Sequence, residues 1–298
     1  MSNEHEHEHV VTVQNFRPKV NPLFKTNIGK ILKHIFLFVF AIFLFAPFVY
    51  LFVSSLKNMG QFYNTDLKMV WFPWPLHWEN YYKAVTQIDL FLYLGNSLFL
   101  AVAQMVLTVI SSAIVAYGFA RFNFKGNTFV FTVVLATMML PTQVTNIPLF
   151  MFYKNLGWLN SYLPLLIPQM FGNAYYIFLL RQFMITLPKE LDEAATIDGC
   201  NSFSIFTKVI APQCVPVFVV VSLFTFLASW KDLWNPLIYL SNAKLYTLPI
   251  GLLFFESPTN FEYTVQLAAV VIALVPTVLF YIFGQRYLDR GINIAELK

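Results

Sequence analysis

Four carboxylates stand close together in one stretch of the chain, residues 188–212, which reads PKELDEAATIDGCNSFSIFTKVIAP. They are Glu190, Asp192, Glu193 and Asp198. Carboxylates do chemistry as catalytic pairs or in metal sites, but the apolar segments around this stretch add no carboxylate pair, metal cluster or nucleophile with a base. An enzyme is therefore the least favoured class, and the acidic stretch is better explained as a surface that another molecule recognises.

A second pattern of possible metal ligands lies at the N-terminus, MSNEHEHEHV, where three histidines alternate with three glutamates. Such an alternation could hold zinc loosely. A flexible tail is the favoured interpretation, because no ordered scaffold is expected around it. Cys200 and Cys214 have no neighbours at zinc-binding spacing, and a disulfide is not expected between them. The sequence therefore predicts neither a metal site nor a cofactor in this chain.

Most of the chain is too apolar for a soluble core. Of 298 residues, 58% are hydrophobic and 11% charged, with a mean hydropathy of +0.62. Six charge-free stretches can cross a hydrocarbon layer of about 30 Å at about 1.5 Å per residue: 35–56, 90–120, 126–153, 155–180, 209–230 and 263–285. We therefore predict an all-α integral membrane protein with six transmembrane helices, its membrane domain (34–290) lying between an N-terminal tail (1–33) and a C-terminal tail (291–298).

The distribution of basic residues predicts the orientation of these spans. Thirteen Lys and Arg residues fall on one side of the alternating loops and five on the other, which places both termini in the cytoplasm. The net charge of +4 mostly reflects this asymmetry, so no nucleic-acid partner is expected. All six tryptophans fall on the outer side. They are typical of an aromatic belt at the lipid headgroups, although some could meet a ligand or partner outside the cell.

Polar residues inside the spans are candidates for a solute path. Lys231 and Asp232 lie near the outer mouth of the fifth span, with Asp232 as the candidate to face a pathway, and no other formal charge lies in a span. This weighs against a proton- or sodium-coupled carrier. The candidates for the path or its mouth are Asn96, Gln104, Gln143, Asn146, Gln169, Asn173, Trp230, Asp232 and Asn235. The Asn and Gln side chains among them suit a neutral hydroxylated solute, but could equally join helices to one another.

The acidic stretch itself predicts a cytoplasmic helical hairpin. Thr186 can cap the first arm, Gly199 can end it with a positive φ, and Asn201 or Ser202 can cap the second. Phe203, Phe206, Val209 and Ile210 are expected to share a face that ties the second arm to the membrane helices. Lipid headgroups are a poor ligand for this hairpin, because the inner leaflet is anionic and the first arm is acidic. A protein partner is favoured.

The hairpin also resembles a known element. EAATIDG (193–199), followed by Phe206, Ile210 and Pro212, is similar to the EAA loop of ABC importer permeases. WFPWPLHWENYYKA, MMLPTQVTNIPLF and SWKDLWNPLIYL resemble the carbohydrate-uptake, maltose-type branch of that family, over residues 36–290. The resemblance implies a type I permease fold with a coupling loop at 186–212. The residues it implies for contact with the ATPase are Glu193, Ala194, Ala195, Asp198, Gly199, Phe203, Phe206 and Pro212. The ending GINIAELK departs from the family's usual small-residue tail.

The resemblance further implies the partners of the chain. They are a second homologous permease, two ATP-binding subunits, an extracytoplasmic solute-binding protein and membrane lipid. The chain contains no GxxxxGK[ST] phosphate loop, so ATP and Mg are expected on the partner ATPase subunits. The expected function is half of a sugar-translocation path with alternating access. A polyol or glycerol-phosphate permease, or a stand-alone channel or ion-coupled carrier, remains as an alternative.

Overall fold

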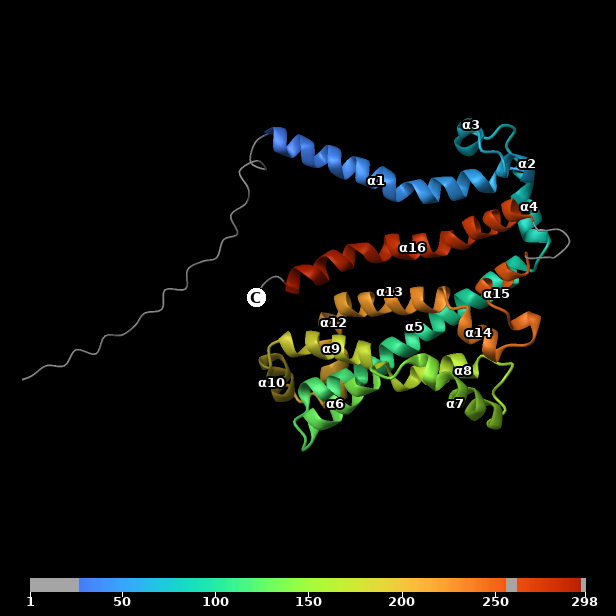
Figure 1. Ribbon diagram of the computed structural model, residues 1–298. Coiled ribbons are helices and arrows are strands. Elements are labelled where there is room, and N and C mark those ends of the chain that lie inside the picture. Colours follow the sequence, from blue (N-terminus) through green and yellow to red (C-terminus); the bar gives the residue numbers. More distant parts are fainter. Residues whose placement is uncertain (1–26, 256–261, 296–298) are drawn as a thin grey trace, which may run out of the picture. The chain divides into compact units, whose positions relative to one another are not determined.

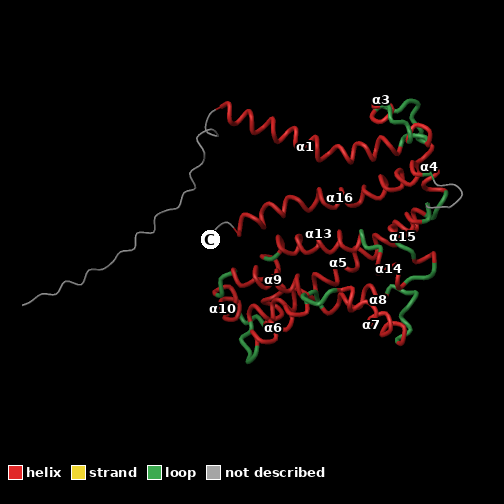
Figure 2. The backbone as a smooth tube through the Cα atoms, in the orientation of Figure 1, coloured by secondary structure: helices red, strands yellow, loops and turns green. Residues whose placement is uncertain are grey.

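The computed structural model describes residues 27–255 and 262–295, and every regular element in these two ranges is helical (Figures 1 and 2). The chain forms two compact units, Met1–Tyr50 and Leu51–Lys298. Four described helices are long and apolar enough to span a membrane, or five if one sharply bent pair counts as a single span. The prediction of an all-α fold built on apolar helices is confirmed.

The helices follow one another with short connections. Their bounds are α1 Asn27–Ser55, α2 Met59–Phe62, α3 Leu67–Trp71, α4 Glu79–Thr86, α5 Leu90–Arg121, α6 Asn127–Thr137, α7 Thr142–Asn155, α8 Leu163–Leu166, η2 Ile167–Phe171, α9 Ala174–Thr186, α10 Glu190–Ile197, α11 Ser202–Ile205, η3 Phe206–Ile210, α12 Ala211–Gln213, α13 Val215–Trp230, α14 Trp234–Tyr239, η4 Ala243–Leu245, α15 Leu248–Leu253 and α16 Tyr263–Ala295. Among them, η2 and η4 are 3-10 helices and η3 is a π-helical turn.

Helix α5 is the central element of the second unit. Its 32 residues make it about 48 Å long at about 1.5 Å per residue. It packs against α9 and α13, and α13 packs in turn against α16. Ala113 and Ala116 on α5 are buried in this contact, and their small side chains let the neighbouring backbones approach closely.

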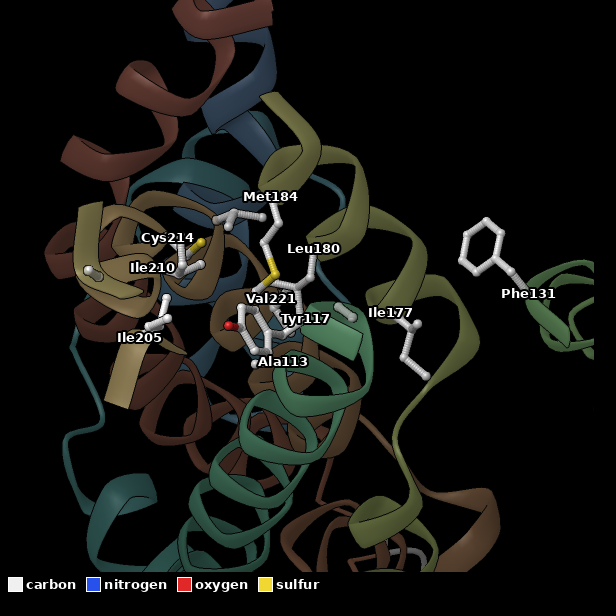
Figure 3. Close-up of a cluster of buried hydrophobic side chains, with 13 residues drawn as sticks. Ala113, Tyr117, Phe131, Ile177, Leu180, Met184, Ile205, Ile210, Cys214 and Val221 are labelled. Carbon is white, nitrogen blue, oxygen red and sulfur yellow. The ribbon is translucent and has the colours of Figure 1, made fainter. Parts of the chain in front are cut away.

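A buried apolar cluster joins α5 to the helices that follow it (Figure 3). In Figure 3, Leu180 and Met184 point from α9 towards Tyr117 on α5, and Ile205 and Ile210 approach from the other side. The cluster therefore fixes the second arm of the acidic hairpin to the membrane helices.

A second cluster joins α13 to α16. The ring of Phe226 stacks on Trp230 at a centroid distance of 5.6 Å and on Phe280 at 4.1 Å. Ala268 and Ala269 of α16 are fully buried in the same cluster. Trp230 thus lies in the packing between helices in this structure.

The third expected span is not one helix. Residues 126–153 form α6 and α7, separated at 138–141. Pro141 explains the break, because a proline offers no backbone N–H and disfavours helical geometry in the residue before it. A charge-free stretch shows where the chain can meet lipid, but it does not show where the backbone must turn.

The fourth expected span begins later than predicted. A turn follows α7, in which Gly157 has φ 70° and Asn160 has φ 58°, and the apolar helical segment then runs over Leu163–Thr186 instead of 155–180. Arg181 does not end it, because its guanidinium lies 4.2 Å from the centre of the Phe131 ring and its Nε donates to the Phe119 carbonyl at 3.3 Å. The positive charge is therefore partnered within the protein.

The fifth expected span contains a sharp bend. The helical segment Ser202–Gln213 and helix Val215–Trp230 meet at an angle of 79°. Val209 therefore belongs to the arm before the bend, and the apolar helix proper begins at Val215. Pro212 and Pro216 flank the bend, and neither can donate the backbone N–H that a continuous helix would need there.

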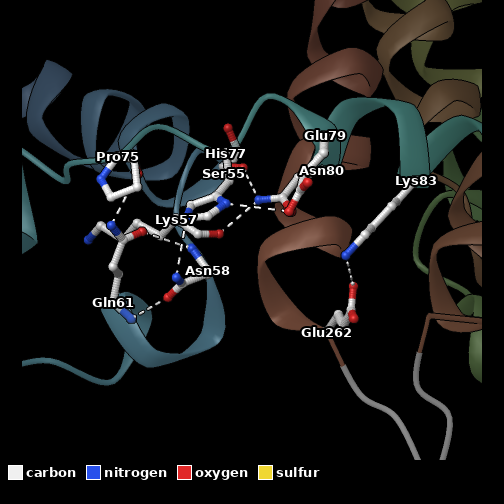
Figure 4. Close-up of polar contacts among 10 residues, drawn as sticks. All are labelled: Ser55, Lys57, Asn58, Gln61, Pro75, His77, Glu79, Asn80, Lys83 and Glu262. Atoms are coloured by element: carbon white, nitrogen blue, oxygen red, sulfur yellow. Dashed lines mark hydrogen bonds and ion pairs between the residues drawn. The ribbon is translucent and has the colours of Figure 1, made fainter.

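The segment between α1 and α5 forms a small lobe held by polar contacts (Figure 4). Lys57 is buried, and its Nζ donates to the Val70 carbonyl at 2.8 Å. Burial lowers the pKa of this lysine from its ordinary value. Asn80 donates to the carbonyls of Ser55 and Lys57, each at 2.8 Å. These bonds close the loop onto the end of α1, so the lobe is an ordered structure.

Candidate functional site

The first arm of the acidic hairpin is α10, which begins after Lys189 with no side-chain cap. The prediction that Thr186 caps this arm is wrong. Thr186 is the last residue of α9, and its Oγ1 donates to the Phe183 carbonyl at 2.7 Å. Leu187 is extended (ψ 136°), as expected of a residue before proline. The chain therefore needs three residues, 187–189, to turn between the helices.

The turn between the two arms follows the prediction. Gly199 has φ 79°, a conformation that glycine adopts without strain. Its N–H donates to the Thr196 carbonyl and that of Cys200 donates to the Ala195 carbonyl, both at 3.0 Å. This pair of bonds is a Schellman motif. Asn201, and not Ser202, caps the second arm by accepting from the Ser204 N–H at 2.8 Å.

An ion pair fixes the base of the hairpin to α5. Arg121 Nε lies 3.2 Å from Asp192 Oδ2, and the two side chains are only 6% and 22% exposed. Both terminal nitrogens of Arg121 also donate to the Leu187 carbonyl at 3.2 Å. Next to it, Tyr117 donates to the Ser202 carbonyl at 3.3 Å and its ring lies 5.0 Å from that of Phe206. Each arm of the hairpin is thus bonded to the same end of α5.

Sequence reasoning missed this ion pair. It treated Arg121 only as one of the basic residues that set the orientation, and Asp192 only as part of the acidic surface. The available signal was an arginine directly at the end of a long charge-free span, followed in the chain by an acidic helix.

The remaining hairpin residues divide into an anchored set and an exposed set. Ala195 is buried and Phe206 is half-buried, whereas Glu193, Ala194, Asp198, Gly199, Phe203 and Pro212 are exposed. The expectation that Phe203 helps to tie the arm to the membrane helices is wrong, since 71% of it is exposed. The buried face is centred on Ile205, and residues two apart on a helix point about 200° apart. The hairpin therefore presents carboxylates and one large aromatic ring on a rigid base.

A polar cavity of about 500 Å³ lies far from the hairpin along α5. Its polar lining includes the Thr145 hydroxyl together with five carboxamides and one carboxylate: Gln104 from α5, Gln143 and Asn146 from α7, Gln169 from η2, and Asp232 and Asn235 around the start of α14. The rest of the lining consists of three aromatic side chains, Tyr153, Trp234 and Tyr239, and of leucines and prolines. The volume is within the range of small-molecule sites, about 300–1,000 Å³.

The structure therefore gathers six of the nine candidates for the path around one cavity: Gln104, Gln143, Asn146, Gln169, Asp232 and Asn235. Tyr153 and Tyr239 were not anticipated. Their rings meet edge to face at 5.5 Å and so join α7 to α14. No signal in the sequence separated these two tyrosines from the many other aromatic residues.

Three further candidates lie outside the lining of this cavity. Asn96 donates to the carbonyls of Lys244 and Tyr246, each at 2.9 Å. Asn173 caps α9 by accepting from the Tyr175 N–H at 3.0 Å. Trp230 stacks in the core cluster described above. Each makes contacts that join or start helices, which was the alternative explanation for polar residues in the spans.

No group of three or more His, Cys, Asp or Glu side chains that could hold a metal ion occurs in the described ranges. The predicted tail pattern at residues 4–9 lies outside them. Residues 296–298 of the C-terminal tail also lie outside the described residues.

Comparison with known proteins identifies the family. Residues 108–294 match the model of the "binding-protein-dependent transport system inner membrane component" family. The chain is 31% identical to the probable ABC transporter permease protein YurM of Bacillus subtilis, covering 96% of this chain and 94% of that protein. It is also 31% identical to the arabinooligosaccharides transport system permease protein AraQ of Halalkalibacterium halodurans, covering 85% and 90%.

A solved structure shows the same fold. It is described as the crystal structure of a bacterial ABC transporter involved in the import of the acidic polysaccharide alginate. Its matching chain superposes with a TM-score of 0.79 at 21% identity, covering 91% of this chain and all of that one. The predicted permease family and the type I permease fold are thereby confirmed. The chain therefore belongs to the binding-protein-dependent inner membrane component family, as the multi-pass permease subunit, and not an enzyme, of an ABC importer that works with a separate ATPase and a binding protein.

Proposed function

We propose that this permease imports a sugar or oligosaccharide and that the hairpin α10–α11 is the element through which a partner ATPase drives it. Relatives named for arabinooligosaccharides and diacetylchitobiose support the substrate class. The observation that carries the coupling role is the construction of the hairpin. Its exposed carboxylates and Phe203 stand on a base fixed by the Arg121–Asp192 ion pair, so a force on the surface reaches α5 without being lost in a flexible loop.

The proposed assembly contains a second, homologous permease as the other half of a heterodimer, two ATP-binding subunits that hold ATP and Mg, and an extracytoplasmic solute-binding protein. Membrane lipid surrounds the spans. Both termini lie in the cytoplasm in this proposal, which the excess of Lys and Arg on the hairpin side supports. A fluorescent protein fused after Lys298 tests the orientation, because it should fluoresce only if that terminus is cytoplasmic.

The proposed mechanism is alternating access. Closure of the ATPase subunits moves the hairpin, and the contacts of Tyr117 and Arg121 pass the movement to α5. That helix continues to Gln104 in the polar cavity, so both regions belong to one rigid element. Gln143, Asn146, Asp232 and Asn235 line the path in this proposal. Asn96, Asn173 and Trp230 hold the helices that form its walls.

The experiment compares two substitutions of exposed phenylalanines. Phe203 on the hairpin is 71% exposed and Phe72 in the lobe after α1 is 81% exposed, so replacing either with Ser leaves the core intact. The importer with Phe203→Ser should lose co-purifying ATPase and ATP-driven sugar uptake. Phe72→Ser should retain its ATPase. Normal ATPase retention and uptake in the Phe203→Ser importer would contradict the coupling role.

A further inference from the structure

The polar cavity has a negative wall. Asp232 is the one carboxylate among the described residues that line it, and none of those residues is Lys, Arg or His. Lys231, the residue before Asp232 in the chain, is exposed and is not part of the lining. A solute in the cavity therefore meets a carboxylate, carboxamides and aromatic rings. An anionic solute would meet repulsion without a compensating cation.

The carboxylate is held in place and retains capacity to accept further hydrogen bonds. Asn235 donates its backbone N–H to Asp232 Oδ1 at 3.2 Å and its Nδ2 to Oδ2 at 2.8 Å. An ionised carboxylate offers about four acceptor positions, so these two bonds leave room for hydroxyl donors. Hydrogen bonds to a charged acceptor are stronger than those between neutral groups.

Other parts of the lining are also fixed in advance. Gln169 Oε1 accepts from Thr108 Oγ1 at 3.0 Å, and its backbone carbonyl accepts from Ser111 Oγ at 2.7 Å. Ordering these groups before a ligand arrives reduces the entropy lost on binding. Trp234 is exposed and lines the same cavity, and an indole ring offers a flat apolar face with a polar edge. Hydroxyl acceptors beside a flat apolar ring match the two chemical faces of a sugar.

From this arrangement we infer that this subunit itself binds an uncharged sugar unit in the polar cavity, with Asp232 accepting its hydroxyls, and that the same carboxylate excludes acidic sugars. The inference rests on the proposed sugar import and adds the charge class of the substrate and the subunit that contacts it. The cavity volume of about 500 Å³ is sufficient for a small ligand.

The test measures binding directly, because a binding protein would filter the substrates in an uptake assay. The importer with its partner subunits is placed in nanodiscs without the binding protein. It is titrated by calorimetry with arabinotriose, xylotriose and maltotriose as neutral probes and with trigalacturonic acid as the acidic probe. Asp232→Asn removes the charge while keeping the shape. Asp89→Asn is the matched control, because Asp89 is exposed and does not line the cavity.

The wild-type importer should bind at least one neutral probe more tightly than the acidic probe. Asp232→Asn should weaken the affinity for the neutral probe by about 10- to 100-fold, as expected for lost hydrogen bonds to a charged group. The affinities for the neutral and the acidic probe should therefore become more similar. A purely structural defect would weaken both probes equally. Gln143 is an exposed helical position, so Gln143→Ala should weaken the affinity for the neutral probe several-fold without affecting folding. Asp89→Asn should change neither affinity.

The inference is overturned if the acidic probe binds as tightly as the neutral ones, if Asp232→Asn matches the wild type, or if a neutral probe that the importer transports shows no binding. ATP-driven uptake with the binding protein present is measured separately. Absence of uptake of every saccharide by the wild type counts against the proposed function. Uptake of a neutral probe together with an unchanged Asp232→Asn affinity overturns only the cavity assignment.

Discussion

Replacement of Gly199 offers a quantitative test of the hairpin. Its φ of 79° lies in the left-handed region, and a Cβ built there would have no atom within 4 Å. The cost of Gly199→Val is therefore backbone strain alone, about 1–2 kcal/mol for a residue with a Cβ. Since about 1.4 kcal/mol is a factor of ten, the population of the closed turn should shift by roughly 5- to 30-fold. Gly199→Asn should cost less, because asparagine tolerates this conformation.

The native cysteines provide the assay. Cys200 is half-buried next to the turn and Cys214 is buried, so opening of the turn should expose the first thiol and not the second. The rate of maleimide labelling at Cys200, measured by mass spectrometry, should rise in Gly199→Val by the factor given above. ATP-driven uptake should fall while the amount of permease in the membrane stays normal.

Gly157 gives the matched control for this experiment. It has φ 70° and also no atom within 4 Å of a built Cβ, but it lies in the turn after α7. Gly157→Val therefore introduces the same strain away from the hairpin and should leave Cys200 labelling unchanged. Equal labelling rates at Cys200 in the wild type and Gly199→Val, with uptake retained, would refute the reasoning.

Further substitutions at three sites test the packing around α5. Removing either charge of the Arg121–Asp192 pair should destabilise the purified permease by about 1–3 kcal/mol. A double-mutant cycle measured by thermal unfolding should show that the two substitutions are coupled, and zero coupling would contradict the pairing. Gly251→Ala would place a Cβ against the Tyr93 ring and should lower the stability of the permease by about 1–3 kcal/mol. A smaller residue at position 93 should restore the lost stability, and an unchanged melting temperature in Gly251→Ala would refute the expected clash. Asn96→Leu leaves two backbone carbonyls without their donor, so limited proteolysis should cut faster near 244–246, and unchanged cleavage would show that these bonds are dispensable.

Two hairpin features that depend on neighbouring residues were predicted from the sequence, whereas a third, the expected cap at Thr186, was wrong. The turn at Gly199 and a cap at Asn201 or Ser202 follow from local backbone preferences; the turn occurs as expected, and Asn201 is the residue that caps. The span boundaries were less accurate, because the absence of charge does not report the breaks that Pro141 and Gly157 impose. Arg181 shows the converse, since a charge that finds partners inside the protein does not end a helix.

Features that depend on which helix faces meet could not be read from the sequence. Asn96 and Gln104 are both amides on α5, yet one bonds to backbone carbonyls near η4 and the other lines the polar cavity. Their side chains point in different directions, and only the packed structure shows what lies opposite each. The Arg121–Asp192 pair was missed for the same reason.

The bend at Cys214 gives the second arm of the hairpin a mechanical property that a straight helix would lack. The segment Ser202–Gln213 leaves the axis of α13 at 79°, and its twelve residues extend about 18 Å at about 1.5 Å per residue. A force parallel to α13 that acts at Ser202, the end of this segment away from α13, therefore exerts a torque on that helix. The other end of α13 is Trp230, two residues before Asp232, so the torque is transmitted towards the carboxylate in the polar cavity.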